Sequence, residues 1–161
     1  MIKRLKKEEI KLAIDLGNQI YPAEFHESLE SFENKFSFFP DGFLGYFVNQ
    51  EMIGYCIGHP WRGEDLVPLD YRGTFPKGSD CFYLHDVAVH PDYRRQGFGK
   101  ELVDTLLEVG GGEGFEKFML VAINDASRKM CEKIGFRVCE KVLYGENPAY
   151  RMKLVLKTNR Y

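Results

Sequence analysis

Residues 82–107 read FYLHDVAVHPDYRRQGFGKELVDTLL, and this stretch decides the fold. Its first part is an aromatic and β-branched run that ends at Pro91, which predicts a strand. A basic turn with two glycines follows, from Arg94 to Gly99. From Leu102 onward, apolar residues recur on one side with helical spacing. The expected order is therefore strand, loop, helix.

The turn before this helix is suited to an anion, and best to phosphate. The first N–H groups of a helix have no partner within the helix and lie at the positive end of its dipole. The turn lacks the Gly-Lys-Ser/Thr ending of a P-loop and the first glycine of G-x-G-x-x-G. Gly97 and Gly99 allow close approach of a ligand, and Arg94, Arg95 and Lys100 add positive charge.

Length and composition indicate one domain, residues 1–161, with a sizeable core. A net charge of −2 and a pI near 6.1 argue against a nucleic-acid partner. No apolar run is long enough to cross a bilayer, and the N-terminus is charged rather than signal-like. We therefore expect a cytoplasmic protein without a membrane partner, either a monomer or a homodimer.

The cysteines show neither a C-x-x-C pair nor histidines at zinc spacing. We therefore expect reduced thiols and no metal site. The four cysteines are Cys56, Cys81, Cys131 and Cys139.

Periodicity and turn residues predict an α+β arrangement on a mixed sheet. The expected helices are 8–20, a second one with Ser28 as N-cap, the helix after Gly99, and Asn124 to Ile134 with Gly135 as its cap. The other expected strands are 2–5, 43–48, 52–58, 118–123, 136–144 and 150–156. Residues 59–80 are expected to be irregular and 110–114 to form a flexible connector.

Two motifs resemble the GNAT superfamily of N-acetyltransferases. Arg94-x-x-Gly97-x-Gly99 resembles its acetyl-CoA pyrophosphate loop, and Asn124 through Gly135-Phe136 resembles its Asn-x-x-Ala-x-x-Phe-Tyr-x-x-x-Gly-Phe motif. The resemblance implies the GNAT fold, a mixed, mostly antiparallel sheet of about seven strands with about four helices, splayed at strands 4 and 5. It also implies acetyl-CoA as cosubstrate, bound by Val87, Ala88, Val89, Arg94, Arg95, Gln96, Gly97, Phe98, Gly99, Lys100 and Asn124.

Within the family, the strand before the loop resembles the branch of arylalkylamine N-acetyltransferases. That branch carries His-x-His there, and this chain has Tyr83 and His85. Strand alternation predicts that Tyr83, His85, Val87 and Val89 share one face, with Asp86 and His90 opposite. A histidine has an ordinary pKa of about 6.5 and an alkylammonium one of about 10.4, so His85 is the candidate base.

The position of the family's usual general acid, a tyrosine, is occupied here by Cys131. Cys131 is either a buried apolar group or an acid, and Tyr83, Tyr144 or Tyr150 are alternatives. Candidate walls of the amine pocket are Tyr21, Phe25, His59 and Trp61. The acceptor is expected to be an arylalkylamine or a polyamine-like amine. A weak acyl-CoA-binding module and a protein lysine or N-terminal acetyltransferase are the alternatives.

Overall fold

The computed structural model describes residues 1–156. Seven strands form one sheet in the order β1-β2-β3-β4-β5-β7-β6. The strands are β1 Ile2–Arg4, β2 Phe43–Val48, β3 Glu51–Trp61, β4 Cys81–Val89, β5 Lys117–Ala122, β6 Arg137–Tyr144 and β7 Asn147–Val155. The α-helices are α1 Ile10–Ile20, α2 Leu29–Phe38, α3 Phe98–Gly112 and α4 Asp125–Ile134. This confirms the expected α+β GNAT fold.

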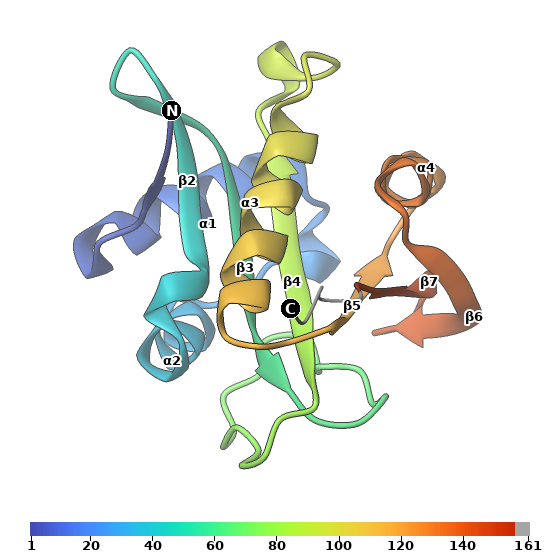
Figure 1. Cartoon of the computed structure of the whole chain (residues 1–161). Helices are drawn as coiled ribbons and strands as arrows, with labels where there is room; N and C mark the ends of the chain where they lie inside the picture. Colours follow the sequence, from blue (N-terminus) through green and yellow to red (C-terminus); the bar gives the residue numbers. More distant parts are fainter. Residues whose placement is uncertain (157–161) are drawn as a thin grey trace, which may run out of the picture.

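The helices cover the two faces of the sheet in pairs (Figure 1). Leu102, Leu106 and Cys131 place α3 and α4 in one apolar core with β4 and β5. Ile10 and Phe32 place α1 and α2 in a second core, against β2 and β3. No helix within residues 1–156 has the length and apolar character needed to span a membrane.

The sheet opens between β4 and β5. These strands are parallel and pair only over Phe82–Leu84 and Phe118–Leu120, whereas every other neighbouring pair is antiparallel. Beyond Leu84, β4 turns away from β5, as the predicted splay requires. The edge of β4 that faces β5 is therefore free of strand partners from residue 85 onward.

The helix starts follow local sequence signals. The side chain of Ser28 accepts a hydrogen bond from Ser31 N and caps α2, and Asn124 accepts one from Ser127 N and caps α4. Gly135 ends α4 with φ +123°, a conformation that favours glycine. Ser28 and Gly135 were predicted as caps from the sequence, whereas Asn124 was predicted only as the start of its helix.

Three predicted boundaries are wrong, and one of them is the start of β7, which lies at Asn147 and not at residue 150. β3 continues through His59–Trp61, because these residues pair with Cys81–Tyr83 of β4, so only residues 62–80 form the irregular loop. α3 runs on to Gly112, and the glycines do not form a connector. A Cβ at Gly110 would lie 2.6 Å from the ring of Phe118, so the glycine lets α3 pack directly on the sheet.

Candidate active site

A bulge in β4 sets the geometry of the site. Asp86 pairs with Ile57 and Leu84 pairs with Gly58, so His85 is an extra residue without an opposite partner. An extra residue reverses the alternation of side chains beyond it. The two-residue period that holds before His85 therefore does not continue into the second half of the strand.

The predicted division of faces is wrong for this reason. Before the bulge, Tyr83 lies on the side that carries Trp61; after it, Val87 and Val89 pack on the α3 side. The side chains of His85 and Asp86 both reach partners contributed by the α1–α2 side of the molecule. Asp86 is therefore a neighbour of His85 in the site and not a residue of the opposite face.

The peptide groups of Val87 and Val89 point toward the open edge of β4. His90 N donates to Ile53 O at 2.7 Å, and antiparallel pairs alternate between bonded and non-bonded, which places Val87 and Val89 in the non-bonded positions. Two side-chain contacts agree with this orientation. Tyr21 Oη lies 2.8 Å from Val87 O, and Arg94 Nε donates to Val89 O at 3.4 Å.

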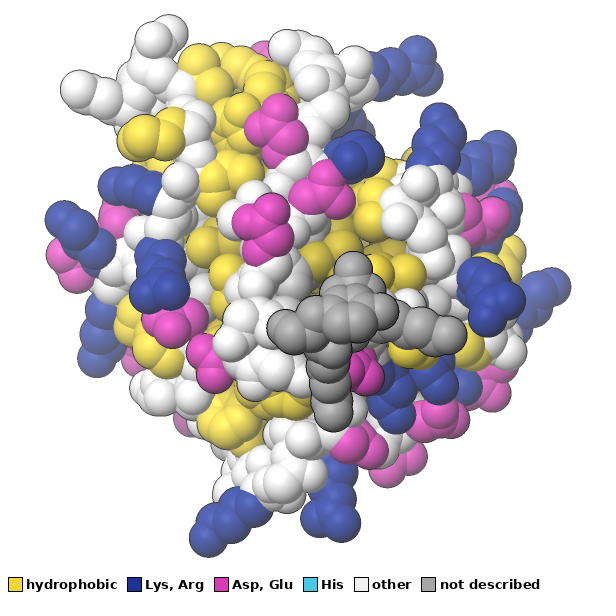
Figure 2. Space-filling view, viewed as in Figure 1, with side chains coloured by type: hydrophobic (Ala, Val, Ile, Leu, Met, Phe, Trp, Pro, Cys, Tyr) yellow, Lys and Arg dark blue, Asp and Glu magenta, His cyan; other side chains and the backbone are white. Residues whose placement is uncertain are grey.

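A cavity lies between the splayed strands β4 and β5. Its wall is formed by β4, β5, α3, α4, the segment after α1 and the end of β6. Figure 2 shows hydrophobic side chains in the hollow between α3 and α4. Residues that line the cavity include Tyr21, Phe25, Glu27, Tyr83, His85, Asp86, Val87, Met130, Cys131 and Tyr144.

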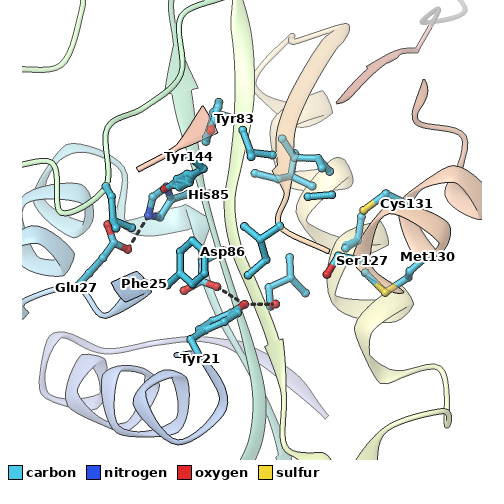
Figure 3. Close-up of a pocket in the computed structure, with 18 residues that line it drawn as sticks. Tyr21, Phe25, Glu27, Tyr83, His85, Asp86, Ser127, Met130, Cys131 and Tyr144 are labelled. Atoms are coloured by element: carbon cyan, nitrogen blue, oxygen red, sulfur yellow. Dashed lines mark hydrogen bonds and ion pairs between the residues drawn. The ribbon is translucent and has the colours of Figure 1, made fainter. Parts of the chain in front are cut away.

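His85 is held by a carboxylate that the sequence did not identify. Its Nε2 lies 2.8 Å from Glu27 Oε2, and the side chain of Glu27 is 5% exposed (Figure 3). An ionised carboxylate only accepts, so in the neutral ring Nε2 carries the hydrogen and Nδ1 carries the lone pair. Nδ1 is buried and has no hydrogen-bond partner within the described residues. The arrangement is an oriented imidazole with a vacant acceptor atom.

Glu27 joins three parts of the chain. Its Oε1 accepts from Asp70 N of the loop at 2.8 Å and lies 3.6 Å from Lys35 Nζ of α2, whose side chain is fully buried. Burial raises the pKa of Glu27, but His85 and Lys35 outweigh this effect and hold it at about 2. Burial also lowers the pKa of Lys35, and the negative charge of Glu27 opposes this effect. Glu27 is therefore ionised near neutral pH.

Asp86 is enclosed by two tyrosine hydroxyls. Tyr55 Oη donates to Asp86 Oδ2 at 2.7 Å. Tyr21 Oη lies 2.8 Å from Asp86 Oδ1 (Figure 3). Burial raises the pKa of Asp86, and a positive charge on the His85 ring, when present, opposes this only in part. Tyr21 lines the cavity as predicted, but through its hydroxyl it also joins α1 to β4.

The predicted aromatic wall divides into two groups. Phe25 lines the cavity and stacks on Tyr144, with ring centroids 6.1 Å apart. His59 and Trp61 do not line the cavity; they are buried in β3, where His59 stacks on Tyr83 at 5.9 Å. Burial lowers the pKa of His59 to about 3, so its ring is neutral. These two residues are packing partners of Tyr83 behind the cavity.

The glycine turn lies at the end of β4, beyond the cavity. Gly97 is the N-cap of α3 with φ +84°, and nothing lies within 4 Å of the position of a Cβ there. Arg94, Arg95 and Gln96 are exposed, Phe98 and Gly99 are partly buried, and the free N–H groups of α3 begin here. Lys100 is tied to Asp104 by an ion pair of 2.6 Å, so its charge is partly neutralised rather than free beside the turn.

Cys131 forms part of the apolar core as well as of the cavity wall. It is 4% exposed, and burial raises the pKa of its thiol to about 11. Such a thiol is a weaker acid than a free one, which favours the packing interpretation over a role in proton transfer. All four cysteines are unpaired, as expected.

A profile of the acetyltransferase (GNAT) family matches residues 10–136, well over half of the chain. The chain belongs to the acetyltransferase (GNAT) family. The match includes the bulged strand, the glycine turn and α4.

Curated relatives cover part of this GNAT protein. Serotonin N-acetyltransferase of Mesocricetus auratus is 30% identical over 98 residues, which are 61% of this chain and 47% of the relative. Glucosamine 6-phosphate N-acetyltransferase of Trypanosoma brucei brucei is 31% identical over 88 residues, 54% of this chain and 59% of the relative. The chain thus spans about half the length of the curated relatives that it matches.

Solved structures share the fold along nearly the whole chain. Ard1 from Thermoplasma volcanium has a TM-score of 0.79 at 16% identity, with 98% of each chain covered. A GNAT-like decarboxylase, GphF, solved in complex with isobutyryl-CoA, has a TM-score of 0.81 at 14% identity, with 98% of this chain and 100% of that chain covered. At these identities the likeness establishes the GNAT fold.

Proposed function

We propose that this GNAT protein is an acetyl-CoA-dependent N-acetyltransferase that transfers acetyl directly to the primary amine of a small molecule. One observation carries the proposal. A single cavity brings together the vacant Nδ1 of His85 and the free peptide edge of Val87 and Val89. The amine needs an acceptor for its proton, which Nδ1 of His85 supplies. The thioester needs hydrogen-bond donors for its carbonyl oxygen, which the peptide edge supplies.

The cosubstrate has a continuous path in this proposal. The pyrophosphate binds the free N–H groups of the turn around Gly97, with Arg94 and Arg95 supplying positive charge. The pantetheine arm follows the open edge of β4, where the peptide groups of Val89 and Val87 have no strand partner. GphF, a structural neighbour, was solved with isobutyryl-CoA, which supports a CoA thioester as the ligand type.

The chemistry then assigns separate tasks to the two sides of the cavity. The acceptor arrives as an ammonium ion with a pKa of about 10.4, so it must lose a proton before it attacks. His85 Nδ1 takes that proton while Glu27 holds the other nitrogen. The N–H of Val87 polarises the thioester carbonyl and stabilises the oxyanion as the C–N bond forms. No nucleophilic side chain is needed, so the transfer is direct.

A small acceptor is supported by the loop of residues 62–80. The loop is fixed to α2 by bonds from Ser28 N and Ser28 Oγ to Asp70 Oδ1, both 2.8 Å, and to β7 through Glu64 and Arg151. Leu69 of the same loop lines the cavity. A fixed loop over the acceptor side favours an enclosed pocket over the open groove that a protein substrate requires.

The aromatic walls favour an arylalkylamine over a polyamine. The stacked rings of Phe25 and Tyr144 present flat apolar surface to the cavity. The carboxylate that a polyamine would seek, Glu27, is already engaged by His85, Lys35 and Asp70. An acceptor with one ammonium and an aromatic ring matches these contacts.

Release of CoA thiol from acetyl-CoA across a panel of amines tests the proposal. The panel contains arylalkylamines, a polyamine, an amino sugar phosphate and a peptide with a free N-terminus. We expect turnover that is highest with an arylalkylamine. Tight binding of acetyl-CoA without turnover on any amine would leave only the acyl-CoA-binding alternative, and turnover on the peptide alone would leave the protein acetyltransferase.

A further inference from the structure

Three oxygen–oxygen contacts around Asp86 require more hydrogens than its two tyrosine partners possess. Tyr55 Oη lies 2.7 Å from Asp86 Oδ2, while Tyr21 Oη lies 2.8 Å from both Asp86 Oδ1 and Val87 O. A carbonyl and an ionised carboxylate only accept, and each hydroxyl has one hydrogen. If Asp86 were ionised, one of the three contacts would bring two oxygen atoms together with no hydrogen between them.

A proton on Asp86 fills all three contacts. The carboxylic acid then donates from Oδ1 to Tyr21, the hydroxyl of Tyr21 donates to Val87 O, and Tyr55 donates to Oδ2. Burial of this carboxyl raises its pKa and acts in the same direction. The other titratable groups that act on this cluster are His85, Glu27, Lys35, Tyr144 and Arg94.

The hydroxyl of Tyr21 lies where a leaving group would need a proton. It touches Val87 O, which faces the open edge of β4, and the thioester is proposed to lie against the N–H of the same residue. Tyr21 lines the cavity (Figure 3), whereas Tyr55 is fully buried and approaches Asp86 from β3. Of the two hydroxyls, Tyr21 therefore has access to the ligand.

We propose that Asp86 is held as a carboxylic acid and that it protonates the leaving CoA thiolate through the hydroxyl of Tyr21. This inference rests on the proposed function. It identifies the acid that the family's tyrosine position, occupied here by the buried Cys131, does not supply.

The proton transfers balance over the whole reaction. Collapse of the tetrahedral intermediate breaks the C–S bond, and the electron pair leaves on sulfur. Sulfur takes the hydrogen of Tyr21 while the oxygen of Tyr21 takes the hydrogen of Asp86, so Tyr21 stays neutral and Asp86 becomes a carboxylate. Two protons leave the acceptor nitrogen during the reaction. One is released to solvent and the other restores Asp86.

Three variants test the pair by their effect on kcat. Tyr21→Phe keeps the ring and loses the proton path, and Asp86→Asn can still donate a hydrogen bond to Tyr21 but cannot release a proton. Tyr55→Phe is the matched control, because it also removes one hydrogen bond to Asp86. We expect kcat to fall about 10- to 100-fold in the first two, at or below the lower end of the range for acid–base catalysis, since a thiolate is a fair leaving group.

The outcomes separate this inference from the proposed function. We expect a smaller fall in kcat for Tyr55→Phe than for Tyr21→Phe, with the acetyl-CoA Kd unchanged in Tyr21→Phe. Equal losses in both tyrosine variants would show that the cluster only supports packing, and wild-type kcat in Tyr21→Phe would overturn the inference while leaving the N-acetyltransferase standing. No turnover by the wild type on any amine would instead overturn the proposed function.

An infrared measurement tests the protonation state without activity. At neutral pH the wild type should show a carboxylic-acid carbonyl band that Asp86→Asn lacks. The measurement needs only folded protein, and Tyr21→Phe remains available if Asp86→Asn does not fold. Identical spectra in the carboxylic-acid region would show that Asp86 is ionised and would overturn the inference.

Discussion

Glu27→Gln changes the orientation of the proposed base with little change in shape. The Oε1 atom of Glu27 accepts from Asp70 N at 2.8 Å, and a glutamine oxygen must keep that bond because a backbone N–H can only donate. The new NH2 group then faces His85 Nε2, which is also a donor in the wild type. The ring avoids two opposed donors by moving its hydrogen to Nδ1, the atom proposed to accept the proton of the amine.

The expected loss of unfolding free energy follows from the lowered pKa of Glu27. Its pKa falls from 4.5 to about 2, which corresponds to roughly 3 kcal/mol of stabilisation for the carboxylate at neutral pH. This stabilisation is present above pH 4.5 and is lost as the pH falls toward about 2. The variant loses it at every pH and leaves the buried Lys35 without its partner, so we expect a loss of unfolding free energy of about 3 kcal/mol.

The assay is kcat/KM for the amine as a function of pH, measured on protein shown to be folded by circular dichroism. We expect Glu27→Gln to lower it at neutral pH by about 100-fold or more, within the range for general base catalysis, and by less at high pH, where the free amine is abundant. Glu30→Gln is the control, since Glu30 pairs with Arg72 on the surface and its side chain is 70% exposed. An unchanged rate and pH profile in Glu27→Gln would refute the role of Glu27.

Three further predictions address the glycine turn, the core and the cysteine. Gly97→Ala should weaken acetyl-CoA binding several-fold in calorimetry, because φ +84° costs an alanine about 1 kcal/mol, whereas Gly111→Ala, a helical position with open space, should not. His59→Phe should lower the pH of acid unfolding. The pKa of His59 falls from 6.5 to about 3 on folding, so the wild type loses up to about 1.4 kcal/mol of stability for each unit by which the pH falls between these values. An unaltered midpoint of acid unfolding in the variant would contradict this. Cys131→Ala should leave kcat within about twofold of wild type if the thiol only packs; a large fall without loss of CoA affinity would make Cys131 an acid.

The sequence indicated the order of elements because local signals determine it. The caps Ser28 and Gly135 and the glycine turn act within a few residues, and their positions were predicted correctly. The extension of β3 through Trp61 depends on pairing with β4 across a 19-residue loop, 62–80, and no local signal reports it. Long-range pairing therefore explains the errors at the strand ends.

The site was predicted in part for a related physical reason. A period of two assumes a regular strand, so it could not detect the extra residue at His85 and placed Val87 and Asp86 on the wrong faces. Glu27 lies 58 residues from His85 along the chain and precedes the cap of α2, where an acidic residue is ordinarily solvent-exposed. Only the folded structure, which brings the segment before α2 beside His85 of β4, shows that it holds the imidazole.

The most direct test is to measure the acetylated amine and free CoA formed by wild type and His85→Ala over a range of pH. We expect wild type to form the two products mole for mole. We also expect His85→Ala to be slowest relative to wild type at neutral pH, with a gap that narrows as the amine loses its proton in solution. Parallel pH profiles for the two proteins, or CoA release without an acetylated amine, would contradict the proposed mechanism.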